Sequence, residues 1–182
     1  MHPTGAGSKA VSFRPLGHED LPRVAQWFGE PEIARWWNGS TSVSELEATY
    51  GPRIEGRATT TMWVVEVDGE AAGLAQHYRH ADHPQHDAAV GVPDAVGIDY
   101  LIDAAHAGRG LGAVVVSRFA AFVLELVPDA EWCVATPARG NRRSWRALEA
   151  AGFRRMGSCE VPGEPPGFIY GRRRGSRGPR PR

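Results

Sequence analysis

A glycine-rich turn near the middle of the sequence is the feature that most restricts the fold. Gly108, Gly110 and Gly112 alternate with Arg109 and Leu111, between an apolar run and a long amphipathic segment. Glycines at alternate positions let backbone N–H groups turn toward one point, and a helix N-terminus adds unpaired donors and partial positive charge. We therefore predict an anion site suited to a pyrophosphate, with Arg109 as a supplementary charge.

Two well-known nucleotide-binding patterns do not fit this turn. The dinucleotide-binding pattern needs an early strand–helix–strand unit and the spacing G-x-G-x-x-G, whereas the phosphate loop of many ATPases needs Gly-Lys-Ser/Thr at its end. Neither is present in the sequence. A tight strand-to-helix turn without a ligand is the alternative to an anion site.

Apolar residues recur at strand or helix spacing along the rest of the chain. Strands are predicted over residues 11–16, 60–67, 71–78, 96–102, 131–135, 153–161 and 167–171, and helices over 19–28, 32–37, 44–50, 109–126 and 142–151. Asp68-Gly69 is a strong two-residue hairpin signal, and the polar stretch 80–94 is predicted to be an exposed loop. This order indicates a mixed α/β (α+β) domain.

The 182 residues fit one domain with a core of its own. We expect residues 10–172 to form it, between a disordered N-terminal segment over 1–9 and a disordered basic tail over 173–182. No apolar run reaches the roughly 18–20 residues of a membrane span, and the first residues lack the apolar region of a secretory signal. Two cysteines, Cys133 and Cys159, suggest neither a disulfide framework nor a metal site, so we expect a cytoplasmic protein.

The formal net charge of zero hides an uneven distribution. Six of the 21 basic residues are arginines within the last eleven positions, so 15 basic residues face 21 acidic ones in the rest of the chain. A negative body attracts cations and repels nucleic acid. We expect a small cationic amine as the partner, no nucleic acid or membrane, and a monomer or a homodimer.

Two motifs follow the glycine-rich turn in a fixed order. Asn141-Arg142-Arg143-Ser144 comes first, and Leu148-Glu149-Ala150-Ala151-Gly152-Phe153 comes next. The strand, the G-x-G-x-G turn and the N-x-x-S…E-x-x-G-F helix together resemble the acetyl-CoA core of the GNAT superfamily of N-acetyltransferases. The resemblance implies the GNAT fold, a central twisted mixed sheet with a splay between two central strands, flanked by helices.

The same resemblance implies where acetyl-CoA, the co-substrate, would bind. Its pantetheine arm would lie in the splay like an extra strand, with Asn141 contacting that arm. Its pyrophosphate would accept hydrogen bonds from the N–H groups of Arg109, Gly110, Leu111 and Gly112. The N–H group of Tyr100 or Leu101 would polarise the thioester carbonyl.

Further motifs resemble the aminoglycoside 6′-N-acetyltransferases in particular. They are Gly97-Ile98-Asp99 before the turn, Ala75-Gln76, the paired tryptophans of Arg35-Trp36-Trp37-Asn38-Gly39, and the opening Phe13-Arg14-Pro15-Leu16. The similarity runs from about Val11 to Tyr170. It implies an enzyme that moves acetyl to the 6′-amine of an aminoglycoside, and hence antibiotic resistance. The residues expected to bind the acceptor are Trp36, Trp37, Gln76 and Asp99.

Acetyl transfer to an alkyl ammonium needs a base, because the nitrogen is not a nucleophile until it loses a proton. Asp99 is an acid inside the apolar run 96–102, where burial would raise its pKa and make it a better proton acceptor. In the resembling enzymes the aspartate of this motif lies beside the substrate amine. We predict Asp99 as the catalytic base; an aspartate paired with a neighbouring arginine on the strand face is the alternative.

Aromatic and imidazole side chains give weaker signals. Paired tryptophans can stack on sugar rings or bind cations over their faces, and two aromatics in a short helix also suit a hydrophobic core. Four histidines lie close together in the sequence, at His77, His80, His83 and His86. Their spacing lacks a closed metal-ligand pattern, so we predict a solvated loop and no metal.

Three positions depart from the family pattern. Ala107 stands where Arg or Gln is common, Leu148 where a tyrosine often protonates the departing thiolate, and Thr136 where the aminoglycoside enzymes often carry an acid. Two alternatives therefore stay open: an acetyltransferase of hydroxylysine-type amines in siderophore assembly, and a weakly catalytic GNAT-fold binder of cationic ligands. Enzymes of the first kind tend to have a histidine where this chain has Ile98-Asp99.

Overall fold

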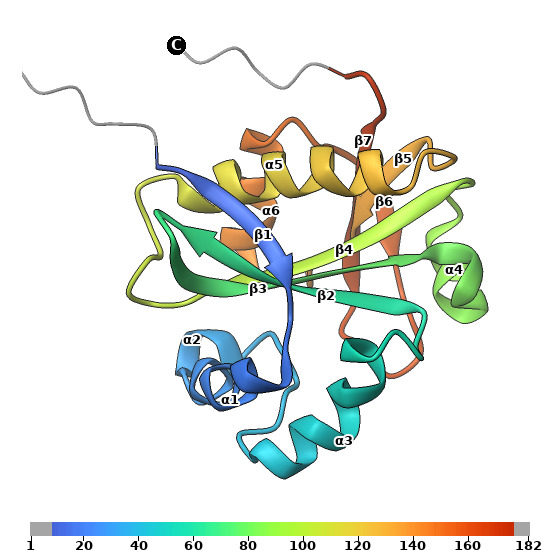
Figure 1. Ribbon diagram of the computed structural model, residues 1–182. Coiled ribbons are helices and arrows are strands. Elements are labelled where there is room, and N and C mark those ends of the chain that lie inside the picture. Colours follow the sequence, from blue (N-terminus) through green and yellow to red (C-terminus); the bar gives the residue numbers. More distant parts are fainter. Residues whose placement is uncertain (1–8, 177–182) are drawn as a thin grey trace, which may run out of the picture.

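The computed structural model describes residues 9–176, and one sheet organises them (Figure 1). Its strands lie in the order β1-β2-β3-β4-β5-β7-β6. Their bounds are β1 Val11–Pro15, β2 Thr60–Val67, β3 Glu70–Arg79, β4 Ala95–Ile102, β5 Trp132–Ala135, β6 Arg154–Cys159 and β7 Gly167–Arg173. Neighbouring strands are antiparallel except for β4 and β5, which are parallel.

Helices cover both faces of the sheet (Figure 1). They are α1 Leu21–Phe28, α2 Pro31–Ala34, α3 Val43–Ile54, α4 Pro84–Val90, α5 Leu111–Leu126 and α6 Arg142–Ala150, with short 3-10 turns η1 His18–Asp20 and η2 His80–Asp82. No helix in this part of the chain is long and apolar enough to cross a membrane.

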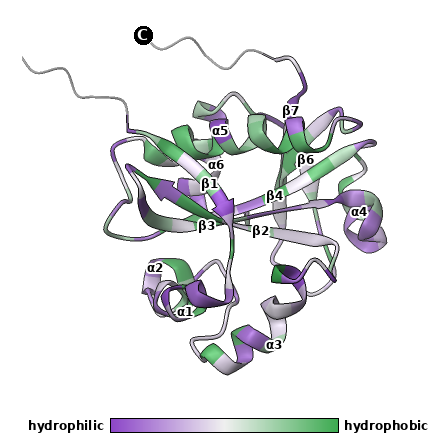
Figure 2. Ribbon diagram, in the orientation of Figure 1, coloured by the Kyte–Doolittle hydropathy of each residue, from purple (hydrophilic) through white to green (hydrophobic). Residues whose placement is uncertain are grey.

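Consecutive strand residues point to opposite faces, so β2, β3 and β4 each contribute to two hydrophobic cores. On one face, Val65 and Ile98 pack with Phe119 of α5. On the other face, Val64 and Leu101 pack with the residues of α1 and α3. Figure 2 shows the hydrophobic residues along α5 and a mostly hydrophilic α4.

A splay between β4 and β5 positions the site. The two strands pair over only three residue pairs, the last of them Gly97 with Val134. β5 ends at Ala135, and Pro137 follows soon after, a residue without the N–H group that a ladder requires. Beyond Gly97 the edge of β4 has no strand partner on this side within residues 9–176. The mixed sheet with a splay that the sequence motifs predict is thereby confirmed.

The predicted hairpin between β2 and β3 is also confirmed. Asp68 and Gly69 have φ angles of 53° and 85°, as the two central residues of a type I′ turn require. Val67 pairs with Glu70 across the turn. The local signal was sufficient here because only glycine, asparagine and aspartate take this conformation readily.

The prediction of an exposed loop over 80–94 is wrong. Residues 80–82 form η2 and residues 84–90 form α4, and the His80 side chain is only 1% exposed. Pro84 occupies the first turn of α4, where its missing N–H group costs nothing. Gly91, at φ 63°, closes the helix in the left-handed conformation. The polar composition of the segment gave no indication of a short helix, because the residues that this helix packs against lie outside it.

The C-terminal boundary also differs from the prediction. β7 includes Arg173, and the Arg174 guanidinium donates hydrogen bonds to the carbonyl oxygens of Val127 and Ala130, at 2.7 and 3.0 Å. Both arginines therefore belong to the fold, because the carbonyl groups after α5 supply acceptors for them. The rest of the predicted terminal segments, residues 1–8 and 177–182, lies outside the described residues.

Candidate functional site

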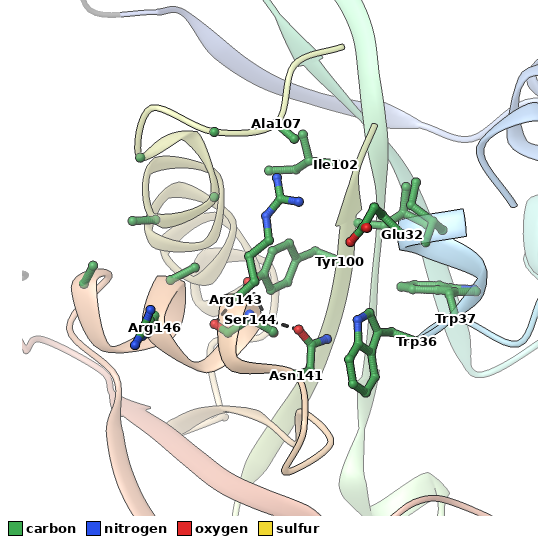
Figure 3. A pocket seen from close by; sticks show the side chains of 18 residues that line it. Glu32, Trp36, Trp37, Tyr100, Ile102, Ala107, Asn141, Arg143, Ser144 and Arg146 are labelled. Atoms are coloured by element: carbon green, nitrogen blue, oxygen red, sulfur yellow. Dashed lines mark hydrogen bonds between the residues drawn. The ribbon is translucent and has the colours of Figure 1, made fainter. Parts of the chain in front are cut away.

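Two adjoining cavities lie where β4 separates from β5. The first, of about 360 Å³, lies between α2, β4, α5 and α6, and Figure 3 shows the side chains that line it. The second, of about 450 Å³, extends past Asp99 toward the loop between β6 and β7. Five residues line both cavities, namely Trp36, Trp37, Tyr100, Asn141 and Ser144. A ligand in one cavity can therefore meet a ligand in the other at this junction.

The glycine-rich turn forms one end of the first cavity. Gly108, Arg109 and Gly110 all have positive φ angles, of 101°, 49° and 77°. Within the described residues, the N–H groups of Arg109, Gly110 and Gly112 have no backbone acceptor, whereas that of Leu111 donates to the Gly108 carbonyl oxygen at 3.0 Å. The turn thus presents free N–H donors at the start of α5, as an anion site requires. The N–H group of Leu111 is already engaged, because it closes the turn.

A buried carboxylate holds the loop before this turn. Asp103 is 4% exposed, and its Oδ1 atom accepts hydrogen bonds from the N–H group and from Nδ1 of His106, at 2.9 and 2.7 Å. The N–H group of Ala104 donates to Glu30 Oε2 at 2.8 Å. Aspartate is common in turns because its side chain can accept a hydrogen bond from a backbone N–H group a few residues later. An aspartate at the end of a strand and before a glycine-rich turn is therefore the sequence signal that could have identified Asp103.

Two arginines of α6 supply cationic charge to the first cavity. Arg143 and Arg146 line it (Figure 3), and residues three apart share a helix face. Arg109, which the sequence singled out as the cation, has an exposed side chain and does not line this cavity. Sequence reasoning missed the α6 pair, although both residues follow Asn141 at helical spacing.

The N-terminus of α6 meets β4 at the junction of the cavities. Asn141 caps the helix, since its Oδ1 atom accepts a hydrogen bond from the Ser144 N–H group at 3.1 Å (Figure 3). The Tyr100 hydroxyl lies 3.4 Å from both Ser144 Oγ and the Ser144 carbonyl oxygen. Leu101 lines the first cavity while its side chain joins the core under α1 and α3. The three predicted residues Asn141, Tyr100 and Leu101 are thus brought to one groove.

Asp99 is held by a side-chain network in the second cavity. Gln76 lies opposite Asp99 in the β3–β4 ladder, and its Nε2 atom donates to Asp99 Oδ2 at 2.9 Å. Arg53 Nη1 donates to Gln76 Oε1, also at 2.9 Å. Burial raises the pKa of the Asp99 carboxyl, and the Gln76 hydrogen bond, followed by the charges of His86 and Arg53, acts in the opposite direction. The net rise makes Asp99 a better proton acceptor near neutral pH.

The two tryptophans have different surroundings. Trp36 is 40% exposed, and its ring covers Gly140, where a Cβ atom would lie 3.2 Å from the ring. Trp37 stacks on Phe28, with ring centroids 6.0 Å apart, and its Nε1 atom donates to the Tyr50 hydroxyl at 3.4 Å. Trp37 therefore belongs partly to the core, whereas Trp36 spans the junction of the cavities. Both follow α2 rather than lie within it.

A second carboxylate reaches the second cavity from a distant part of the chain. Glu164, in the loop between β6 and β7, lines this cavity together with Asp99, Tyr78 and Thr136. Thr136, at the position where the sequence lacks an acid, thus lines a cavity that the carboxylate of Glu164 also lines. Glu164 lies in a Gly/Pro-rich connection that gave no functional signal in the sequence. Within residues 9–176, no group of three or more acidic, histidine or cysteine side chains could hold a metal ion.

Comparisons with known proteins match this architecture. The model of the acetyltransferase (GNAT) domain family matches residues 17–161. Aminoglycoside N(6′)-acetyltransferase type 1 from Klebsiella pneumoniae is 27% identical over 173 residues, which cover 86% of this chain and 80% of that protein. The same figures hold for the enzyme of this name from Serratia marcescens.

Solved structures show the same likeness. The crystal structure of aminoglycoside acetyltransferase AAC(6′)-Ib in complex with coenzyme A has a TM-score of 0.78 and 26% identity, over 91% of this chain and 95% of that chain. AAC(6′)-Ib in complex with ribostamycin and coenzyme A gives the same TM-score and identity, over 91% of this chain and 94% of that chain.

Proposed function

The chain belongs to the GNAT acetyltransferase family, and from this premise we propose that it moves the acetyl group of acetyl-CoA to a primary amine of a small polycationic acceptor, the 6′-amine of an aminoglycoside. The observation that carries the proposal is the junction of the two cavities. One cavity ends in free N–H donors and arginines, and the other holds two carboxylates. An anionic acetyl donor and a cationic acceptor would meet between them.

The first cavity offers hydrogen-bond donors and cationic side chains that suit acetyl-CoA. The free N–H groups of Arg109, Gly110 and Gly112 would bind the pyrophosphate at the start of α5. Arg143 and Arg146 would add charge for the phosphates. The unpaired edge of β4 would accept the amide groups of the pantetheine arm as an added strand does. The crystal structure of a relative with coenzyme A supports this assignment.

Asp99 would act as the base. Its carboxylate would take a proton from the acceptor ammonium, and the freed amine would attack the thioester carbonyl carbon. The N–H group of Tyr100 or Leu101 would stabilise the oxyanion. The carbon–sulfur bond would then break. Leu148 is buried and offers no hydroxyl, but a thiolate of pKa about 8.5 can leave without a dedicated acid.

The second cavity fits an acceptor with more than one positive charge. Asp99 and Glu164 line the same space, and Trp36 offers a flat ring on which a sugar can stack. Gln76 would act mainly on Asp99, because both ends of its amide group are already hydrogen-bonded. The relative AAC(6′)-Ib has been solved in complex with ribostamycin and with kanamycin, which are cationic sugars, and this supports the choice.

A thiol-release assay over a panel of amines tests the proposal. We expect amino sugars such as kanamycin to give the highest turnover, because several ammonium groups match two carboxylates. Higher turnover on hydroxylysine-type amines would favour the siderophore alternative. Acceptor binding by calorimetry without thiol release would favour the binder. Higher turnover on a neutral or acidic peptide N-terminus than on every amino sugar would contradict the proposal.

The Gly110→Asp substitution tests the anion site. A side chain at Gly110 meets open space at the cavity, so we expect a folded protein that has lost affinity for CoA through charge repulsion. Gly56→Asp is the matched control, since Gly56 also has a positive φ angle and nothing within 4 Å of an added Cβ atom. Calorimetry with CoA is the measurement, and equal affinity in the two variants would contradict the assignment.

The Glu164→Gln substitution tests the acceptor charge. We expect KM for kanamycin to rise about fivefold, the equivalent of about 1 kcal/mol for an exposed ion pair, with kcat little changed. The effect should fade as salt is added, because exposed charges are screened. Glu160→Gln, four residues earlier and outside the cavity, is the control. An unchanged KM at low salt would remove Glu164 from the acceptor site.

The Asp99→Asn substitution tests the base. It keeps the size of the side chain but removes its basic oxygen, and loss of a general base costs about 10²–10⁴-fold in rate. Burial raises the pKa of Asp99, and only the ionised carboxylate can accept a proton, so the wild type should lose activity as pH falls through that raised pKa. The deficit of the variant should shrink as pH rises toward the pKa of the amine. Near-normal turnover at neutral pH in a CoA-binding variant would defeat the assignment.

A further inference from the structure

A row of side chains crosses the sheet under α3 and ends at Asp99. Met62 of β2, Gln76 of β3 and Asp99 of β4 are register partners, so they share the sheet face that α1 and α3 cover. Arg53 reaches this row from the last turn of α3. Its Nη1 atom donates a hydrogen bond to Gln76 Oε1 at 2.9 Å and lies 3.9 Å from Met62 Sδ. The Arg53 side chain is thereby held against the sheet.

Packing within α3 also holds Arg53 in this place. Tyr50 lies three residues earlier on the same helix face and is only 5% exposed. The Arg53 guanidinium lies over the Tyr50 ring, 5.1 Å from its centroid, as a cation on an aromatic face. Arg53 lines neither of the two cavities. An effect of this residue on the reaction must therefore pass through another side chain.

The chemistry of the three side chains fixes which way the Gln76 amide faces. An arginine has only donors, and an ionised carboxylate has only acceptors. The amide oxygen therefore faces Arg53, and the amide nitrogen faces Asp99, where Nε2 donates to Oδ2 at 2.9 Å. In the reversed orientation the amide oxygen would face a carboxylate oxygen, and only a protonated Asp99 could then form a hydrogen bond with it.

The observed orientation favours the ionised form of Asp99. Burial raises the pKa of this carboxyl, and the Gln76 hydrogen bond is the largest of the effects that lower it. The charge of His86, and after it that of Arg53, acts in the same direction to a smaller extent. The strongest influence that Arg53 can have on Asp99 is thus the orientation that it imposes on the amide.

Other side chains of the second cavity do not replace Gln76 in this contact. Its remaining charged or titratable residues are Arg35, Tyr78, Tyr100 and Glu164. Within the described part of the chain, Gln76 Nε2 is the one side-chain donor to the Asp99 carboxylate. A general base must be in its ionised form before it can take a proton. The orientation of a single amide therefore bears on how much of the base is available at neutral pH.

We propose that Arg53 is a positioning residue, which keeps Asp99 in its carboxylate form by holding the Gln76 amide in the orientation that donates to it. The proposal rests on Asp99 being the base of the proposed acetyl transfer. Arg53 occupies the acceptor end of the amide, so that the donor end is left for Asp99. A helix that packs on the hydrophobic core thereby also takes part in the acid–base chemistry.

The Arg53→Met substitution tests this role through the pH profile of kcat/KM for kanamycin. Methionine keeps an unbranched apolar side chain near Tyr50 but leaves the Gln76 amide free to reverse. The acid limb of the profile reports the ionisation of the base in the free enzyme. We expect it to move upward by about one pH unit, the effect of losing roughly one hydrogen bond to a charged group.

The sign of this shift makes the loss depend on pH. With a higher pKa of Asp99, less carboxylate is present at acidic pH, so kcat/KM should fall about tenfold below both midpoints. On the alkaline plateau Asp99 is ionised in both proteins, and kcat/KM should be near normal. Unchanged CoA affinity would show that the variant is folded. An acid limb that stays in place, with or without a uniform loss of activity, would overturn the role of Arg53.

Two further variants separate the contact from packing and from net charge. Arg53→Lys keeps a charged donor for the amide oxygen, so the acid limb should return part of the way. Arg57→Met is the matched control, because Arg57 forms an ion pair with Glu55 and lines neither cavity; its profile should be that of the wild type. His86 is the same in all these proteins, so its own titration affects their profiles alike.

A double substitution tests whether the effect passes through the amide. Gln76→Met removes both ends of the amide group, so it should raise the acid limb by itself. Arg53→Met should then add little to that shift. Equal shifts from Arg53→Met in the presence and in the absence of Gln76 would show that the guanidinium charge acts directly, and would overturn the positioning role.

A direct titration of the Asp99 carboxyl separates this proposal from the proposed function. The ¹³C resonance of the carboxyl carbon, identified by its loss in Asp99→Asn, should titrate at a higher pH in Arg53→Met than in the wild type, with no acceptor present. An unmoved resonance would overturn the positioning role and leave the proposed function standing. A shifted resonance in a protein whose wild type acetylates no amine of the panel would uphold the effect of Arg53 on Asp99 and overturn the proposed function instead.

Discussion

The early end of the β4–β5 pairing is the constraint on which the rest of the site depends. A parallel pair that stops at Gly97 leaves a row of backbone groups on β4 without a strand to satisfy them. Asp99 follows two residues later, so the carboxylate is carried on the first stretch of β4 that is open to a ligand. The same gap lets the N-terminus of α6 approach Tyr100. The backbone groups of β4 that are not paired with β5 are thus available to a substrate, and the separation of the two strands leaves space for it.

The fold could be predicted where the signals were local or came in a fixed order. Asp68-Gly69 dictated a hairpin by its own conformational preferences, and the glycine-rich turn stood at the start of α5 as its spacing required. The order of the strand, the turn and the Asn141 helix predicted the family, which the family comparison confirmed. The roles assigned to Asp99, Asn141 and the N–H groups of the turn remain predictions.

The features that were missed depend on contacts between distant segments. α4 is a short polar helix, and its His86, together with His83 just before it, packs on Tyr78 of β3; the fold sets this contact, and the periodicity of the segment does not indicate it. Glu164 reaches the cavity of Asp99 from a loop far along the chain. The tryptophan pair shows the same limit of sequence-based prediction. Trp36 and Trp37 are adjacent in sequence, but Trp37 packs on Phe28 in the core whereas Trp36 is exposed at the junction of the cavities. Periodicity describes an element by itself, whereas a site is defined by what meets across elements.

The position of β7 has a consequence for how the chain acquires its shape. β7 is the last strand in sequence but lies between β5 and β6, and β5 reaches the remainder of the sheet through only three residue pairs with β4. During synthesis from the N-terminus, β6 therefore has no strand partner, and β5 has one unpaired edge, until β7 has left the ribosome. The part of the sheet formed by β5, β7 and β6 is thus completed among the last events of folding. Arg174, just after β7, then donates hydrogen bonds to the carbonyl groups that follow α5.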